Sequence, residues 1–131
     1  MRRFIAILAF ALIATSVSAA PETYELKSPN GKLQVMVDAD LCYTLTHDSD
    51  LLLDRSCIGM YLVDGRSFGD SPTPVKMVSY RSVDQTIDAQ FYKKSQIKDC
   101  FNEMTLEYKD FSVIFRAYDD GMAYRFVSRS K

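Results

Sequence analysis

Hydrophobic and polar residues alternate along most of this chain beyond residue 30, and a period of two predicts β-strands. The expected strands cover residues 32–38, 41–46, 51–53, 58–63, 75–80, 86–92, 104–108, 111–118 and 122–127. In the first of them, Leu33, Val35 and Val37 share one face. No stretch repeats apolar residues at helical spacing for three turns, so the pattern predicts an all-β protein.

Turn-forming residues separate these strands. Pro29-Asn30-Gly31, Asp38-Ala39-Asp40 and Asp64-Gly65 are typical of tight turns, because Asn, Asp and Gly tolerate positive φ. Asp119-Asp120-Gly121 predicts a hairpin, in which Gly121 is expected to adopt the positive φ. Residues 66–74 are expected to form a loop and residues 93–95 a bend. Short strands joined by such turns predict an antiparallel β-sandwich or barrel.

The last thirty residues carry the clearest alternation. Apolar side chains occur on both faces of the expected strands at 111–118 and 122–127. A sheet of this kind is expected to be covered on both sides, as the middle layer of a larger stack. The last strand is expected to continue to Lys131, so the chain is expected to be the N-terminal part of a longer protein.

The first nineteen residues predict a signal peptide. Arg2 and Arg3 precede an apolar run at residues 4–14, and small residues follow, with cleavage expected after Ala19. The apolar run is too short to span a bilayer, which takes about 20 residues as a helix. No cysteine stands at the cleavage point, so no lipid or membrane anchor is expected and the mature protein is expected in the periplasm or outside the cell.

Residues 20–131 are expected to form one small domain, an incomplete N-terminal β-sandwich. Their 112 residues carry 14 basic and 17 acidic side chains, for a formal charge of −3. Nucleic acids and anionic membranes both call for clustered Lys and Arg, so neither is an expected partner.

Three cysteines, Cys42, Cys57 and Cys100, match no zinc-binding spacing. In an oxidising compartment any two could pair, and the sequence does not choose among the three pairings. The favoured interpretation is that all three are buried small hydrophobes. His47, beside Asp48, is interpreted as a solvated turn residue.

No nucleophile elbow, phosphate-binding glycine loop or metal-binding helix motif is present. Glu103 and Glu107 lie on the outward side of their strand and are weak candidates for catalysis. Arg116 and Arg125 flank the Asp119-Asp120 turn on paired strands. They are interpreted either as a carboxylate- or ligand-binding pair or, preferably, as an arginine–aspartate network that holds the hairpin.

Aromatic residues are numerous, with eight Tyr and eight Phe but no Trp. Most occupy alternating strand positions, so they are interpreted first as core residues and only second as surfaces on which a sugar ring could stack. Tyr61, Tyr80 and Tyr92 fit the alternation least, yet they define no specific sugar site.

The run Asn102-Glu103-Met104, together with VIFRAYDDGMAYRF at residues 113–126, resembles the N-terminal domain of glycoside hydrolase family 97. LKSPNGKL at residues 26–33 resembles the first strand and turn of that domain, and SCIGM at 56–60 resembles its Ser-x-Leu-Gly-Leu segment. The resemblance covers essentially the whole mature chain. Its signature residues are Asn102, Glu103, Arg116, Asp119, Asp120, Gly121 and Arg125.

The resemblance implies a galactose-mutarotase-like β-super-sandwich that precedes a catalytic (β/α)₈ barrel in exported bacterial α-glucosidases and α-galactosidases. In that family the catalytic carboxylates come from the barrel, and a calcium ion is held mostly by barrel glutamates. No catalytic, cofactor-binding or metal-binding residue is therefore carried over to this chain. The expected partners are the barrel and, through the intact enzyme, an α-glucoside or α-galactoside.

Three functions remain open from the sequence. The preferred one is a non-catalytic N-terminal part of such a glycosidase. The alternatives are a stand-alone exported carbohydrate-binding module and a non-functional gene remnant.

Overall fold

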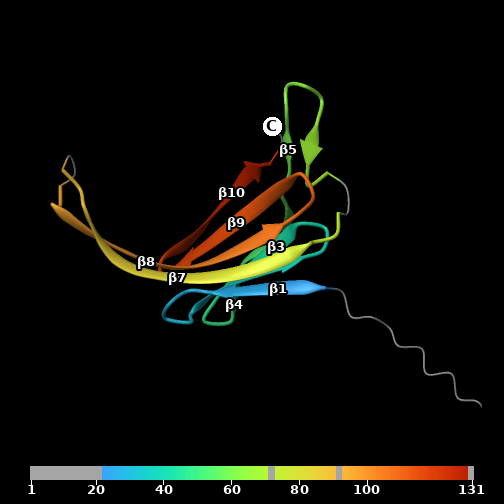
Figure 1. Cartoon of the computed structure of the whole chain (residues 1–131). Coiled ribbons are helices and arrows are strands. Elements are labelled where there is room, and N and C mark those ends of the chain that lie inside the picture. The colour runs from blue at the N-terminus through green and yellow to red at the C-terminus, as the bar shows by residue number, and fades with distance from the viewer. Residues whose placement is uncertain (1–21, 71–72, 91–92, 130–131) are drawn as a thin grey trace, which may run out of the picture.

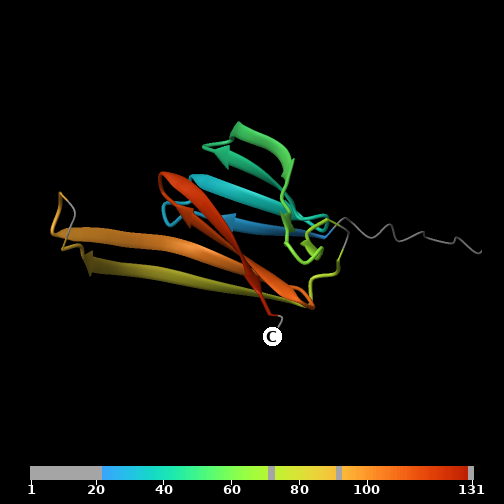
Figure 2. The same ribbon diagram turned by 90° about the horizontal axis from the view of Figure 1, so that it is seen from above.

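The computed structural model describes residues 22–70, 73–90 and 93–129. These residues form ten β-strands and no helix, which confirms the predicted all-β antiparallel class. Figure 1 shows the strands as two layers, and Figure 2 shows the layers from above. The expected signal peptide and cleavage point lie outside the described residues. No helix that meets the length and hydropathy needed to cross a bilayer occurs in the described ranges.

The first sheet has the order β1-β2-β3-β4, with every neighbouring pair antiparallel. Its strands are β1 (Thr23–Lys27), β2 (Leu33–Asp38), β3 (Cys42–His47) and β4 (Asp50–Cys57). In β2, Leu33, Val35 and Val37 are buried and alternate with half-buried residues, as the period of two predicted. β4 is a single strand of eight residues, where the sequence predicted only residues 51–53.

The second sheet has the order β10-β9-β8-β7 and is also antiparallel. Its strands are β7 (Met77–Asp88), β8 (Gln96–Glu107), β9 (Phe111–Tyr118) and β10 (Gly121–Ser128). β7 runs unbroken through the gap that was predicted between residues 80 and 86. β10 ends at Ser128, so the expectation that this strand continues to Lys131 is wrong for Arg129.

The core lies between the two sheets. Val35 and Val37 of the first sheet are fully buried, as are Met104, Val113 and Phe115 of the second. Burying a side chain of this size contributes about 1.5–3 kcal/mol relative to leaving it exposed. The inward residues of the second sheet include Phe126, which packs partly buried against this core.

A small third sheet closes one end of the sandwich. It pairs β5 (Met60–Tyr61) with β6 (Ser67–Phe68), inside a segment predicted to be partly loop. Phe68 is buried and stacks on Phe111 of β9 with ring centroids 4.7 Å apart. Gly69 has a φ of +80°, and a Cβ added there would lie 2.6 Å from the carbonyl oxygen of Ile58, so only glycine fits.

Two hairpin turns differ from each other in backbone conformation. Asp48 and Ser49 join β3 to β4 with φ values of 49° and 76°, as a type I′ turn requires. Asp119 and Asp120 join β9 to β10, as predicted, but Gly121 does not have a positive φ. The predicted role of Gly121 is therefore wrong, because neither Gly121 nor the two aspartates of this turn has a positive φ.

The hairpin of β7 and β8 extends beyond the sandwich and curves away from it (Figures 1 and 2). β9 pairs with β8 only over Asn102–Glu107, so residues 84–88 and 96–100 pair only with each other. We call these two segments the arm.

Candidate functional site

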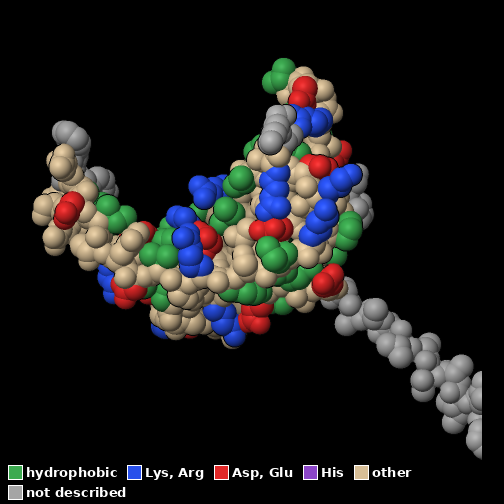
Figure 3. Space-filling model, viewed as in Figure 1, with side chains coloured by type: hydrophobic (Ala, Val, Ile, Leu, Met, Phe, Trp, Pro, Cys, Tyr) green, Lys and Arg blue, Asp and Glu red, His purple; other side chains and the backbone are tan. Residues whose placement is uncertain are grey.

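The second sheet has an outer face, which we define by the side chains of β7–β10 that point away from the first sheet. By register these include Arg81, Phe101, Glu103, Ile114, Arg116, Tyr118, Ala123 and Arg125. In the described residues only the inner face of this sheet is covered, so the predicted cover on both sides is not found there. Figure 3 shows Lys and Arg side chains among hydrophobic ones where this sheet lies toward the viewer.

Glu103 of β8 is the central charged group of the outer face. Its side chain accepts a hydrogen bond from Arg116 Nε at 2.7 Å and lies 2.8 Å from Arg81 Nη2. The two arginines come from the strands on either side of β8, and directly opposed cross-strand residues approach within about 5 Å. Glu103 is only 7% exposed, although within the described part of the chain no further layer covers this face.

The pKa of Glu103 lies below its ordinary value. Burial by itself would raise this pKa, but the hydrogen bonds and charges of Arg81 and Arg116 outweigh the burial and favour the carboxylate form. A general acid in a glycosidase needs the opposite, a raised pKa. Glu103 therefore does not fit the role of a general acid, and its pairing with two arginines indicates a structural anion. Its predicted outward direction is confirmed by the register.

Arg116 is held in place from two sides. Its guanidinium carbon lies 4.3 Å from the ring centroid of Phe101, as in a cation–π contact. Tyr118 packs against the same ring with centroids 5.3 Å apart. Phe101 is consequently 2% exposed, although it faces outward.

Arg125 of β10 lies on the same face, diagonal to Arg116 across the β9–β10 ladder. Both arginines line a shallow hollow of about 130 Å³ with Ile114, Tyr118, Ala123 and Tyr124. Among the described residues, no carboxylate lies within ion-pair distance of Arg125. The preferred arginine–aspartate network is therefore wrong, since Arg116 pairs with Glu103 and not with Asp119 or Asp120.

The remaining signature residues tie the two sheets together or form the turn. Asn102 Nδ2 donates a hydrogen bond of 2.8 Å to the carbonyl oxygen of Lys27 in β1, and its Oδ1 accepts one from Ser82. Asp119 Oδ1 accepts a hydrogen bond of 2.9 Å from the backbone N–H of Asn30, in the turn between β1 and β2. Alternation along the strands could not reveal these contacts, because they join segments far apart in sequence.

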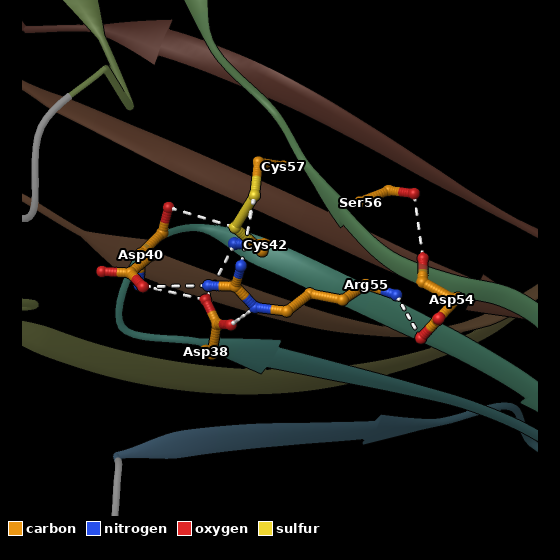
Figure 4. Close-up of polar contacts among 7 residues, drawn as sticks. All are labelled: Asp38, Asp40, Cys42, Asp54, Arg55, Ser56 and Cys57. Carbon is orange, nitrogen blue, oxygen red and sulfur yellow. Dashed lines mark hydrogen bonds and ion pairs between the residues drawn. A yellow bond between two sulfur atoms is a disulfide. The ribbon is translucent and has the colours of Figure 1, made fainter.

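A second polar cluster lies on the first sheet, and Figure 4 shows it. Arg55 of β4 donates from Nε to Asp38 at 2.7 Å and from Nη2 to Asp40 at 2.9 Å. Burial would raise the pKa of Asp38, but hydrogen bonds from the backbone of Cys42 and from Arg55 keep it below its ordinary value. The sequence analysis did not identify this cluster. A signal for it was the pair of aspartates in the turn at 38–40.

Cys42 and Cys57 are opposed on β3 and β4 and form a disulfide, whereas Cys100 is free. The interpretation of all three cysteines as buried hydrophobes is therefore wrong. Only strand pairing identifies the partners, because it places residues 15 positions apart directly opposite each other. Arg55 Nη1 lies 3.8 Å from Cys57 Sγ, so the disulfide and the charged cluster adjoin (Figure 4).

Two of the exposed tyrosines, Tyr61 and Tyr80, are not among the residues that line the outer-face hollow. Tyr61 on β5 is 75% exposed and donates a hydrogen bond to Asp70, and Tyr80 on β7 is 59% exposed. Tyr92 lies outside the described residues. His47 ends β3 with its Nδ1 3.5 Å from Asp48, next to the hairpin turn.

Within residues 22–70, 73–90 and 93–129, no group of three His, Cys, Asp or Glu side chains is placed to hold a metal ion. The described residues therefore do not fit the calcium that the resemblance implies. That calcium stays a prediction about intact members of the family.

A family model described as "Glycosyl-hydrolase 97 N-terminal" matches residues 26–131. A retaining alpha-galactosidase of Bacteroides thetaiotaomicron is 35% identical over 127 residues, which is 95% of this chain but 19% of that relative. The chain therefore spans about a fifth of the length of this curated relative.

Solved structures share the fold. A glycoside hydrolase family 97 enzyme from Pseudoalteromonas sp. strain K8, in complex with acarbose, superposes with a TM-score of 0.72 at 18% identity, covering 82% of this chain and 18% of that one. A beta-arabinopyranosidase superposes with the same score at 23% identity and with the same coverage of both chains. The match of the family model over residues 26–131, with the sandwich described above, places this chain in the glycosyl-hydrolase 97 N-terminal family.

Proposed function

We propose that this chain is a non-catalytic β-sandwich that takes part in carbohydrate hydrolysis as the N-terminal portion of an exported α-glycoside hydrolase. The observation that carries the proposal is the family match over residues 26–131, combined with a curated relative that is an α-galactosidase. In the intact enzyme, the sandwich would pack against the catalytic barrel and contribute to one wall of the substrate site.

The chemistry of the described carboxylates supports a non-catalytic role. Glycosidases use two carboxyl groups across the scissile bond, one of them with a raised pKa. Among the described residues, Glu103 is the buried carboxylate of the outer face; it is held by two arginines, and its lowered pKa does not fit the general acid. Asp38 is likewise held by Arg55.

Export is part of the proposal. The Cys42–Cys57 disulfide supports it, because disulfides persist in the periplasm and outside the cell and are rare in the reducing cytosol. Mass spectrometry of the product secreted by a Gram-negative host tests it. A mature N-terminus at Ala20 is expected, whereas an intact N-terminal segment in the cytosol would contradict export.

A glycosidase assay tests the absence of catalysis. The mature chain is expected to release no product from aryl α-glucosides or aryl α-galactosides, while the α-galactosidase of Bacteroides thetaiotaomicron serves as the active control. Measurable turnover by the chain would overturn the proposal.

A chimaera tests the role as an enzyme domain. Residues 26–131 replace the matching segment of that α-galactosidase, and the product is expected to fold and retain activity. An unrelated β-sandwich of similar length in the same place is the control and is expected to abolish activity. Equal loss of activity in both chimaeras would contradict the proposed role.

The alternative function, a stand-alone carbohydrate-binding module, has one observation in its favour. Tyr61 and Tyr80 expose much of their rings, and exposed aromatic rings can stack on a sugar. Calorimetric titration with maltooligosaccharides separates the two functions, because saturable heat supports the module and its absence supports the enzyme domain.

A further inference from the structure

The outer face of the second sheet carries an excess of positive charge at one place. Arg81 and Arg116 share the single carboxylate of Glu103, and Arg125 lies beside Arg116 in the same hollow. The register places two further carboxylates of β8 on this face: Glu107, which is paired with Arg129 at 2.7 Å, and Asp99, which accepts a hydrogen bond from Gln85 in the arm. Around Glu103, three guanidinium groups thus face one carboxylate, which leaves a local excess of two positive charges among the described residues.

The side chain of Arg116 is preorganised for binding by its contacts within the chain. Its bond to Glu103 engages Nε, and its guanidinium is stacked on the Phe101 ring. The terminal nitrogens of Arg116 are not needed for that ion pair, and the Tyr118 hydroxyl hydrogen-bonds to the same guanidinium. An arginine fixed in this way loses little side-chain freedom when it binds an anion, which favours binding.

The hollow has walls that favour an ionic contact. Ile114 and Ala123 contribute apolar surface beside the two arginines, and Tyr118 contributes a phenol. Charges next to low-dielectric walls attract an oppositely charged ligand more strongly than charges in open water do. The volume of about 130 Å³ is well below that of pockets for drug-sized molecules, about 300–1,000 Å³, so the ligand group is small.

We propose that Arg125 and Arg116 bind a carboxylate in this hollow. A carboxylate is planar and matches the two parallel N–H donors of a guanidinium, and its charge offsets the local excess. The ligand class is a small carboxylate, either free, as in a uronic acid, or on a protein, as in an acidic side chain. The proposal uses only the described residues and does not depend on the function proposed above.

Nuclear magnetic resonance of the mature chain, labelled with ¹⁵N, tests the proposal through the Nε–Hε signals of its arginines. The probes are galacturonate, N-acetyl-glutamate amide, galactose and inorganic phosphate, each added separately. We expect the Arg125 signal to shift saturably with at least one of the two carboxylates and not with galactose. The carboxylate that binds more tightly identifies the source, a saccharide or a protein.

Three variants provide the controls, and their binding is followed through the Arg116 Nε–Hε signal because two of them replace Arg125. Arg125→Gln removes the two parallel N–H donors of the guanidinium together with its charge and is expected to weaken carboxylate binding by about tenfold or more. Arg125→Lys keeps the charge without the parallel donors, and its affinity is expected to be intermediate. Arg66→Gln removes an exposed arginine that pairs with Asp64 on the β5–β6 hairpin and is expected to bind as the original chain does.

Circular dichroism verifies that each variant is folded before titration. The absence of saturable shifts with both carboxylates would overturn the proposal. So would equal binding by Arg125→Gln, or binding of phosphate more tightly than either carboxylate.

Discussion

Glu103 shows how the character of a single residue depends on its cross-strand neighbours. A carboxylate at 7% exposure is costly unless it is paired, and Arg81 and Arg116 provide that pairing from both adjacent strands. Arg81 is well exposed, so part of its contribution is screened by water.

We expect Glu103→Gln to lower the free energy of unfolding by about 1–3 kcal/mol, because it leaves two arginines without a shared anion. Urea denaturation at pH 7 measures this change. The matched control is Glu107→Gln, which breaks the more exposed pair with Arg129 and is expected to cost no more than about 1 kcal/mol. Equal losses in the two variants would contradict the central role of Glu103.

The lowered pKa of Glu103 predicts a pH dependence. Because the folded pKa is below the ordinary value of 4.5, the stabilisation is fully present above that value. It is lost as the pH falls through the lower pKa of the folded state. The difference in unfolding free energy between the original chain and Glu103→Gln is therefore expected to shrink below about pH 4.5. A difference that stays constant from pH 7 to pH 3 would show that the charge of Glu103 is not its cause.

Hairpin turns set the register of the strands, and the β3–β4 and β9–β10 turns use different backbone conformations. In the β3–β4 turn, Ser49 has a φ of 76°, a region that costs an L-residue about 1–2 kcal/mol. In the β9–β10 turn, neither aspartate is in that region.

Ser49→Gly is therefore expected to raise the free energy of unfolding by about 0.5–1 kcal/mol, since glycine adopts positive φ without a steric cost. Thermal unfolding followed by circular dichroism measures the gain. Asp120→Gly is the control, and it is expected to give no gain because its φ is not positive. A gain of the same size at Asp120 would show that the conformation of the turn is not responsible.

The disulfide joins β3 to β4 across a separation of 15 residues. A crosslink that closes a loop of this length stabilises by about 3 kcal/mol, chiefly by restricting the unfolded chain. The double variant Cys42→Ala/Cys57→Ala is expected to lose about that much in urea denaturation. Cys100→Ala, which removes the free thiol, is expected to lose less than about 1 kcal/mol. Full stability in the double variant would contradict a structural role for the disulfide.

At the scale of the whole molecule, the strands of the sandwich have more neighbouring strands and more core packing than the strands of the arm. The part of β8 at Asn102–Glu107 has a strand on each side and a core beneath it, whereas the arm has one strand pair only. Local opening is easiest where few buried contacts hold the backbone.

Amide hydrogen exchange followed by mass spectrometry tests this difference. We expect residues 84–88 and 96–100 to exchange faster than residues 102–107 by about an order of magnitude or more. Peptides from β9 provide an internal reference for slow exchange. Equal protection of the arm and of residues 102–107 would show that something else orders the arm.

Patterns in the sequence correctly predicted the all-β antiparallel class, the inward positions of the clearest strands and most of the turns. They did so because alternation and turn chemistry are local: Val35 and Val37 are recognisable from their immediate neighbours, as is the turn at Asp119-Asp120. They also identified the family, through the segment from Asn102 to Phe126. Local patterns missed β1, β6, the first part of β8 and the continuity of β4 and β7, because pairing with a neighbouring strand extends a strand through residues of weak propensity.

Tertiary structure alone decided which charged and sulfur-bearing side chains meet. Glu103 lies 13 residues from Arg116 and 22 from Arg81, yet all three meet because β7, β8 and β9 are adjacent. The pairing of Cys42 with Cys57 also follows from register, and among the described residues the register places no carboxylate partner beside Arg125. A pattern of period two predicts which face of the sheet a residue occupies. Only the pairing of strands decides which side chains lie beside it on that face.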